Sequence, residues 1–313
     1  MWIKKKFKNL TLWSPGSLSI YLETNQKTLE LVNSDNDRYS FCNNWHYYTE
    51  EISGDINEIP AGIYRYEKIN YSYFLVETTL KHYSSILELE VSKYVIDDFN
   101  KFLQDKEIYQ SLDNMPFRRG VLLFGPPGTG KTSITHKIIQ SVINKNIVVI
   151  FLNEAPSMSF IDALQHDTRI KIFIFEEFTN TLRPNWDMDD KMLDFLDGET
   201  ALDNSYTIAT TNYPERLPQN VVNRPGRFDK FYKIAFLTKQ DIKLYLAHFN
   251  LEPEDCLLNS KELTISQLKE IILLISKDKL TFTEAFQQME KHKCLAHNEF
   301  KVDKRKVGFN SND

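Results

Sequence analysis

The sequence predicts an α/β fold: a doubly wound parallel sheet in the middle of the chain, a β-rich domain before it and a small helical domain after it. Three observations support this prediction. Continuous apolar runs such as Asn146–Leu152 and Lys171–Phe175 are typical of strands buried on both faces of a parallel sheet. Segments of helical periodicity alternate with these strands. Before residue 88, short strand-like runs are instead separated by turn residues.

The composition is that of an ordinary globular protein. The chain has 313 residues, of which 42% are hydrophobic and 26% are charged, a length typical of two or three domains. Its net charge of −5 gives no basic field that would attract nucleic acid. The three widely spaced cysteines predict neither disulfides nor a zinc site, and no apolar run is long enough to span a membrane. We therefore expect a cytoplasmic protein without a membrane span.

Residues 1–88 form the predicted β-rich domain. Its strand-like segments are Ser17–Glu23, Thr28–Val32, Arg38–Cys42, Ile63–Ile69 and Tyr71–Thr78. Strands favour aromatic residues, so the many tyrosines here are expected mainly in a small core, with a binding surface as the alternative. The lysines of Met1–Lys8 are expected at a solvated end, with contact to anionic lipid or nucleic acid as the alternative.

The rest of the chain divides into three parts. The central α/β domain covers residues 89–237 and begins with a helix over 92–104. A helical domain follows over 238–300, and residues 301–313 are a polar tail. Threonine caps with a side-chain acceptor three residues later predict the starts of the helices in the helical domain. These pairs are Thr238 with Asp241, Thr264 with Gln267, and Thr281 with Glu284.

One stretch carries a phosphate-binding pattern. It reads Gly125-Pro126-Pro127-Gly128-Thr129-Gly130-Lys131-Thr132 and lies between a short apolar strand and a helix. This arrangement directs backbone N–H groups and the positive end of a helix at one point. Lys131 is expected to reach the β- and γ-phosphates, and the Thr132 hydroxyl to hold Mg²⁺. A glycine turn in an unrelated α/β protein is the alternative.

Polar residues follow two of the predicted strands. Glu176 and Glu177 end one strand, as in a Walker B motif, where the first acid supports Mg²⁺ and the second polarises the attacking water. Asn212 ends another strand and is expected to bind the water and the γ-phosphate. Two surface acids, or an ordinary turn at Asn212, are the alternatives.

Two arginines follow the last central strand, in Arg224-Pro225-Gly226-Arg227-Phe228-Asp229. They lie too far along the fold to be expected in their own nucleotide site. An arginine donated to a neighbouring subunit would stabilise the transferring phosphoryl group and implies a head-to-tail ring. A turn stabilised by a salt bridge to Asp229 is the alternative.

Together these motifs, in this order and spacing, resemble AAA+ ATPases. The resemblance narrows in Pro116–Phe124, Met192–Gly198 and Thr210–Asp229. These segments are similar to the AAA branch of the mitochondrial respiratory complex III assembly chaperone, which translocates the Rieske iron–sulfur protein. That branch also places Glu first in Walker B, where this chain has Glu176. The resemblance covers residues 75–300 and is strongest from 116 to 229.

The resemblance implies a P-loop AAA+ module with a helical lid, ATP and Mg²⁺ as cofactors, and a role for each matching residue. By this resemblance, Thr132 and Glu176 support the metal, Glu177 activates the water, and Asn212 senses the γ-phosphate. Arg224 and Arg227 are donated to the nucleotide of the neighbouring subunit. Nucleotide binding falls to Gly125, Pro126, Pro127, Gly128, Thr129, Gly130, Lys131, Thr132 and Ser133.

This chain departs from the branch in two ways. It has no membrane helix near residue 1, and Asn153–Phe160, at the position of the first pore loop, lacks the aromatic–aliphatic–Gly pattern. In that segment Met158 is a candidate for substrate contact, and Phe160 is a candidate for either substrate contact or the core.

The sequence therefore predicts a ring-forming ATPase, hexameric or heptameric, that hydrolyses ATP at subunit interfaces to remodel or translocate a protein client held by the β-rich domain. Two alternatives remain at this point. The same core acts on nucleic acid in clamp loaders and helicase loaders, against which the net charge argues. Alternatively, ATP serves only to switch assembly, against which the intact Glu177, Asn212 and arginine pair argue.

Overall fold

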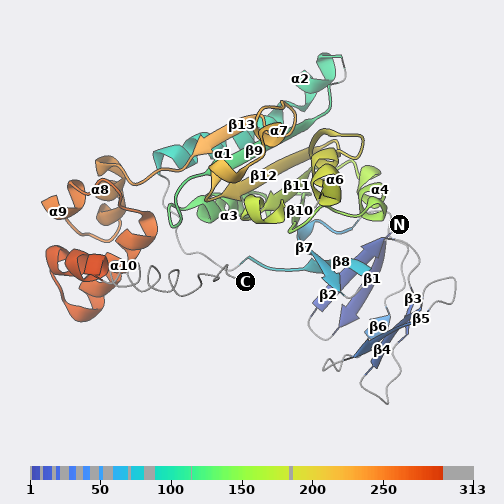
Figure 1. Ribbon diagram of the computed structural model, residues 1–313, viewed down its shortest axis with the longest axis horizontal. Coiled ribbons are helices and arrows are strands. Elements are labelled where there is room, and N and C mark those ends of the chain that lie inside the picture. The colour runs from blue at the N-terminus through green and yellow to red at the C-terminus, as the bar shows by residue number, and fades with distance from the viewer. Residues whose placement is uncertain are drawn as a thin grey trace, which may run out of the picture. The chain divides into compact units, whose positions relative to one another are not determined.

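We analysed the protein as a computed structural model (Figure 1). The structure describes residues 59–69, 72–80, 89–113, 115–182 and 186–291, and before them the backbone of six strands between residues 2 and 51. The predicted tail of residues 301–313 lies outside the described residues. None of the helices in the described part of the chain has the length and apolar character that a membrane span requires.

Ten strands form one sheet, which is the framework of the larger compact unit. In chain order they are β1 (Trp2–Phe7), β2 (Leu10–Pro15), β6 (Thr49–Glu51), β7 (Gly62–Ile69), β8 (Ser72–Glu77), β9 (Arg118–Phe124), β10 (Val148–Phe151), β11 (Lys171–Phe175), β12 (Ser205–Thr211) and β13 (Lys230–Lys233). Their order across the sheet is β13-β9-β12-β11-β10-β7-β8-β2-β1-β6. The first six are parallel, and from β7 onward every pairing is antiparallel.

Helices cover both faces of the parallel part. The register pairs Ile172 with Tyr206 and Phe173 with Thr207, so Tyr206 and Phe173 point to opposite faces. Helix α1 (Glu90–Gln104) packs on the first face, where the Phe99 ring lies 5.0 Å from Tyr206. Helix α6 (Trp186–Asp197) packs on the other face, where a second ring pair, Phe173 and Phe195, is 5.0 Å apart. The prediction of a doubly wound α/β fold is confirmed.

Shorter helices complete this unit. They are α2 (Lys106–Ser111), α3 (Lys131–Val142), α4 (Met158–Gln165), α5 (Phe178–Thr181), α7 (Gln219–Val222) and a 3-10 turn, η1 (Pro214–Arg216). The core on the α4 and α6 face contains phenylalanines from several of these elements, among them Phe160 and Phe178.

The N-terminal strands were predicted to form a domain of their own, but most of them belong to the large sheet. Strand β7 pairs in parallel with β10, from Gly62 beside Val148 to Arg65 beside Phe151, so the sheet of the α/β domain continues across residue 88. Only β3 (Ser19–Tyr21), β4 (Thr28–Val32) and β5 (Arg38–Cys42) form a separate sheet. The domain boundary stays a prediction, but it does not separate two sheets.

The first strand of the chain was not among the predicted strands. The lysines of Met1–Lys8 were predicted at a solvated end, which stays a prediction. The structure places residues 2–7 in β1, between β2 and β6. Long-range pairing, which the local sequence does not encode, forms this strand.

A second compact unit contains Leu87–Glu90, Pro126–Gly130 and the chain from Ile234 onward. Its helices are α8 (Lys239–Ala247), α9 (Asp255–Leu258), α10 (Ile265–Asp278) and a helix over 282–291. All three predicted threonine caps form: the Thr238, Thr264 and Thr281 hydroxyls accept the backbone N–H groups of Asp241, Gln267 and Glu284. The part of the predicted lid after residue 291 lies outside the described residues.

Within the larger unit, the turn before β13 crosses the start of β9 at very short range. Gly120 makes this crossing possible, because a methyl group there would lie 2.0 Å from the carbonyl oxygen of Arg227. Two hydrogen bonds fix the crossing. The Gly120 N–H donates to the Asp229 carboxylate at 2.9 Å, and the Asp229 N–H donates to the Gly120 carbonyl at 2.8 Å.

We predict that Gly120→Ala lowers the free energy of unfolding by about 1–3 kcal/mol, because the methyl group forces two backbone segments apart. Gly62→Ala is the control. Its methyl group would lie 3.3 Å from the Tyr64 hydroxyl, a contact that a displacement of a few tenths of an ångström relieves, and should cost less than about 1 kcal/mol. Urea unfolding monitored by circular dichroism measures both variants. Equal stability of Gly120→Ala and the wild type would contradict the crossing.

Candidate functional site

The predicted phosphate loop joins β9 to α3 at the carboxyl edge of the sheet. All nine predicted nucleotide-binding residues, Gly125–Ser133, lie in this loop or in the first turn of α3. The Gly125 N–H donates to the Thr211 carbonyl at the end of the neighbouring strand β12, at 3.3 Å. Gly128 has a φ of +78°, which residues other than glycine rarely adopt. Its carbonyl accepts the Ser266 N–H at 3.1 Å. Gly125 and Gly128 thus each take part in one main-chain hydrogen bond outside the loop.

The lysine of this loop is buried, with 6% of its surface exposed. The Lys131 ammonium donates to the Gly125 carbonyl at 2.7 Å, which folds the side chain back over the loop. Burial lowers the pKa of Lys131, and the negative charge of Glu177 opposes that shift. A cation in a glycine-rich loop at the start of a helix is what a triphosphate requires.

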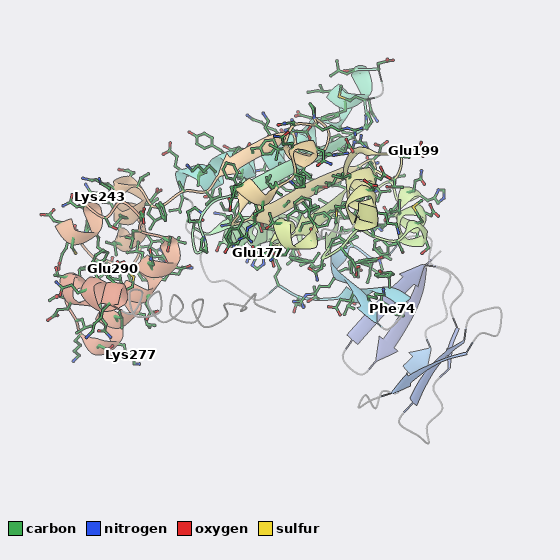
Figure 2. All side chains as sticks on the ribbon, in the orientation of Figure 1. Phe74, Glu177, Glu199, Lys243, Lys277 and Glu290 are labelled. Atoms are coloured by element: carbon green, nitrogen blue, oxygen red, sulfur yellow. The ribbon has the colours of Figure 1, made fainter. Side chains whose placement is uncertain are left out.

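Glu177 lies where β11 ends and α5 begins (Figure 2). It has a left-handed φ of +52°, a conformation that costs a residue with a side chain on the order of 1–2 kcal/mol. Three hydrogen bonds hold it. Its N–H donates to the Thr210 hydroxyl at 3.2 Å, its carboxylate accepts the Asn212 side-chain amide at 2.5 Å, and its carbonyl accepts the Asn180 N–H at 2.7 Å. The structure thus brings two of the predicted site residues, Glu177 and Asn212, into direct contact.

Glu176 and Thr132 are the residues predicted to support Mg²⁺. The Oε1 atom of Glu176 is buried and has no hydrogen-bond partner among the described residues, as expected of an oxygen that serves a ligand. Thr132 exposes its side chain in the first turn of α3. The described residues contain no cluster of three or more His, Cys, Asp or Glu that would form an all-protein metal cage. This fits Mg²⁺, which keeps several waters and binds through few protein groups and substrate phosphates.

His136 was not among the predicted site residues. It lies on α3 one turn after Thr132, is 9% exposed, and is close enough to Glu176 for their charges to interact. Burial lowers the pKa of His136, and Glu176 opposes the shift. The available signal was its spacing of four residues from Thr132, which places both on one helix face.

Arg224 and Arg227 bind one carboxylate. Asp197, at the end of α6, accepts Arg227 Nε at 2.9 Å and pairs with Arg224 Nε at 2.7 Å. The salt bridge that we considered as an alternative therefore exists, but with Asp197 instead of Asp229. The Asp229 carboxylate accepts the backbone N–H groups of Gly120 and Gly226.

These arginines lie at the amino edge of the sheet. Arg227 contacts Gly120 near the start of β9, whereas the phosphate loop begins at Gly125, after its end. Five residues of strand separate the two edges by about 16 Å. The arginine turn and the phosphate loop of one chain are thus at opposite ends of the same strand.

The segment at the predicted pore-loop position is anchored to β7. The Ser157 N–H donates to the Tyr66 hydroxyl at 2.8 Å, and the Tyr66 ring lies 4.6 Å from that of Phe160. Phe160 is fully buried, which decides between the two readings of this residue in favour of the core. Met158 is 59% exposed, so it remains a candidate for substrate contact.

We predict that Thr210→Val lowers the free energy of unfolding by about 1–3 kcal/mol, because the Glu177 N–H loses its acceptor while the side chain keeps its shape. Thr210→Ser keeps the hydroxyl and should cost less than about 1 kcal/mol. Chemical denaturation of the two variants tests this. If the valine variant is as stable as the serine variant, Thr210 does not support the strained conformation.

Comparison with known proteins agrees with this geometry. Residues 121–236 match the family described as ATPase family associated with various cellular activities (AAA). The probable mitochondrial chaperone bcs1 of Schizosaccharomyces pombe is 29% identical over 180 residues, which are 53% of this chain and 39% of that protein. The mitochondrial chaperone BCS1 of Danio rerio is 30% identical over 165 residues, 47% of this chain and 38% of that protein.

A third relative is the ATP-dependent zinc metalloprotease FtsH of Aquifex aeolicus, 26% identical over 230 residues, which are 65% of this chain and 34% of that protein. The chain thus spans less than half the length of each of these three relatives. The predicted resemblance to AAA+ ATPases, and to a branch of mitochondrial chaperones, is confirmed. The parallel sheet, the phosphate loop and the polar strand ends of residues 121–236 are those of an AAA ATPase domain.

Proposed function

We propose that this protein hydrolyses ATP with Mg²⁺ at the interfaces of a homo-oligomeric ring, and that the cycle remodels or moves a protein client. The observation that carries the proposal is the division of the site between two edges of one sheet. The phosphate loop, Glu177 and Asn212 share the carboxyl edge, and the arginine turn is at the amino edge.

In this proposal each residue of the carboxyl edge has one task. Backbone N–H groups of Gly128–Ser133 bind the phosphates, and Lys131 leaves the Gly125 carbonyl to reach the β- and γ-phosphates. Glu177 takes a proton from the water that attacks the γ-phosphorus, while the bond to the β-phosphate oxygen breaks and gives ADP and phosphate. Asn212, already bonded to Glu177, orients that carboxylate and the water.

Thr132 and Glu176 are the groups that would hold Mg²⁺, the first directly and the second through a metal-bound water. The unpartnered Oε1 of Glu176 supports this assignment. When bound, Mg²⁺ neutralises charge that builds up on the phosphates during transfer.

The ring follows from the arginines. Separated from their own phosphate loop by about 16 Å of strand, they can act only on another subunit's nucleotide. A contact between different faces of identical subunits closes into a ring when the rotation fits, and six or seven subunits are our proposal. The relatives named chaperones and an ATP-dependent protease support a protein as the client. The N-terminal strands, continuous with the ATPase sheet, are the proposed place for it to bind.

We predict that Lys131→Ala abolishes ATP binding, because the phosphate loop loses its only cation. Glu177→Gln should bind ATP normally. It should lower turnover by about 10²–10⁴-fold, which is the usual contribution of a general base. Binding of a fluorescent ATP analogue and release of phosphate measure the two steps separately. If Glu177→Gln hydrolyses ATP at the wild-type rate, Glu177 is not the base.

A second prediction concerns assembly. Turnover per subunit should rise with protein concentration, and particle mass measured with ATP present should rise in parallel to that of a ring. Mass photometry together with phosphate release tests this on the full chain. Hydrolysis by a monomer at a rate independent of concentration would refute the ring.

A further inference from the structure

Arg224 and Arg227 both bind the carboxylate of Asp197, but they differ in burial and in their other contacts. The Asp197 side chain is 5% exposed, and each of its oxygens serves one guanidinium: Oδ1 accepts Arg227 Nε at 2.9 Å and Oδ2 pairs with Arg224 Nε at 2.7 Å. One carboxylate therefore serves two guanidinium groups, while the Asp229 carboxylate in the same turn accepts backbone N–H groups instead.

Arg227 is part of the interior. It is 5% exposed, and besides Asp197 it donates through Nη1 to the Asn220 carbonyl at 2.7 Å. A buried carboxylate without a partner is costly, so Arg227 is needed to neutralise Asp197. These two anchors fix its guanidinium inside its own subunit.

Arg224 is oriented differently. Its side chain is 61% exposed, and its ion pair with Asp197 joins Nε to Oδ2 at 2.7 Å. A guanidinium carries five N–H donors, so a contact through Nε leaves donors on the two terminal nitrogens for a further partner. That fork matches the oxygens of a phosphate group.

Contacts of the backbone hold the end of α6. The Arg118 guanidinium donates to the Asp197 carbonyl at 3.4 Å, and the Gly198 N–H donates to the Asp194 carbonyl at 2.8 Å. A methyl group at Gly198 would lie 2.7 Å from the Cα atom of Asp194, so the chain packs closely where the helix ends. These contacts anchor the backbone from which the Asp197 carboxylate extends.

We propose that Asp197 is a positioning residue that presents Arg224 to the nucleotide of the neighbouring subunit, and that Arg224 alone is the donated catalytic arginine. Arg227 then neutralises Asp197 and supports the turn. This inference rests on the proposed ring mechanism and adds to it a division of labour between the two arginines.

A double-mutant cycle on the full chain tests the role of Asp197. Arg224→Ala should keep wild-type stability and ATP affinity and lower turnover by at least about 10³-fold. Asp197→Asn should lower turnover at least tenfold in the wild-type background with ATP affinity unchanged, and by less than threefold in the Arg224→Ala background. Asp197→Glu, which keeps the charge but lengthens the side chain, should show the same pattern. Lys101→Ala, which removes an exposed positive charge on α1, is the control.

Arg227→Ala should do the opposite of Arg224→Ala: it should lower stability and leave turnover per folded ring within tenfold of the wild type. The proposal is overturned if Asp197→Asn, or Asp197→Glu where the asparagine variant does not fold, lowers turnover equally in both backgrounds. It is also overturned if Arg227→Ala abolishes turnover in folded rings.

A mixing experiment separates failure of this inference from failure of the ring. Arg224→Ala subunits keep an intact Glu177, and Glu177→Gln subunits keep an intact Arg224. Randomly mixed rings contain about one interface in four with both groups intact, so the mixture should regain activity that neither variant has alone. If Arg227→Ala needs this rescue and Arg224→Ala does not, the ring stands and the division of labour is wrong. If no mixture regains activity and the wild type is monomeric, the proposed ring itself is wrong.

Discussion

The parallel, in-register pairing of β9, β12 and β11 is the constraint on which the rest of the structure depends. It places Phe124 beside Thr211 and Phe175 beside Ala209, so that the residues after each strand meet at one edge. The same pairing defines the opposite edge, where the arginine turn crosses the start of β9 at Gly120. In the proposed ring, one sheet therefore supplies the two halves of a site that is completed between subunits, and the distance between the halves is the length of a strand.

Both halves of this site contain strain or buried charge that a purely structural sheet end would not need. Glu177 is held in a left-handed conformation by the Thr210 hydroxyl and by Asn212. Asp197 is a buried carboxylate that would be costly without its arginines. In each case several neighbouring groups hold one side chain, Glu177 or Asp197, in place. Preorganised sites are held by supporting contacts of this kind.

The N-terminal strands belong to the same framework. Strand β7 extends the parallel sheet, and its Tyr66 anchors the segment before α4 through the Ser157 N–H. A segment held in this way differs from a free loop that pulls on an unfolded chain. The strands after β7 are joined to it, and so to the parallel sheet, through main-chain hydrogen bonds.

The sequence by itself determined the elements that obey local rules. Continuous apolar runs specified the buried strands, the spacing of glycines and Lys131 specified the phosphate loop, and threonines with acceptors three residues later specified three helix starts. Tertiary structure decided what depends on residues distant in the chain. The pairing of β1 and β7 into the large sheet has no local signal, because strand partners are chosen by long-range hydrogen bonding. Asp197 and Arg224 are 27 positions apart, and only the approach of α6 to the arginine turn brings them together.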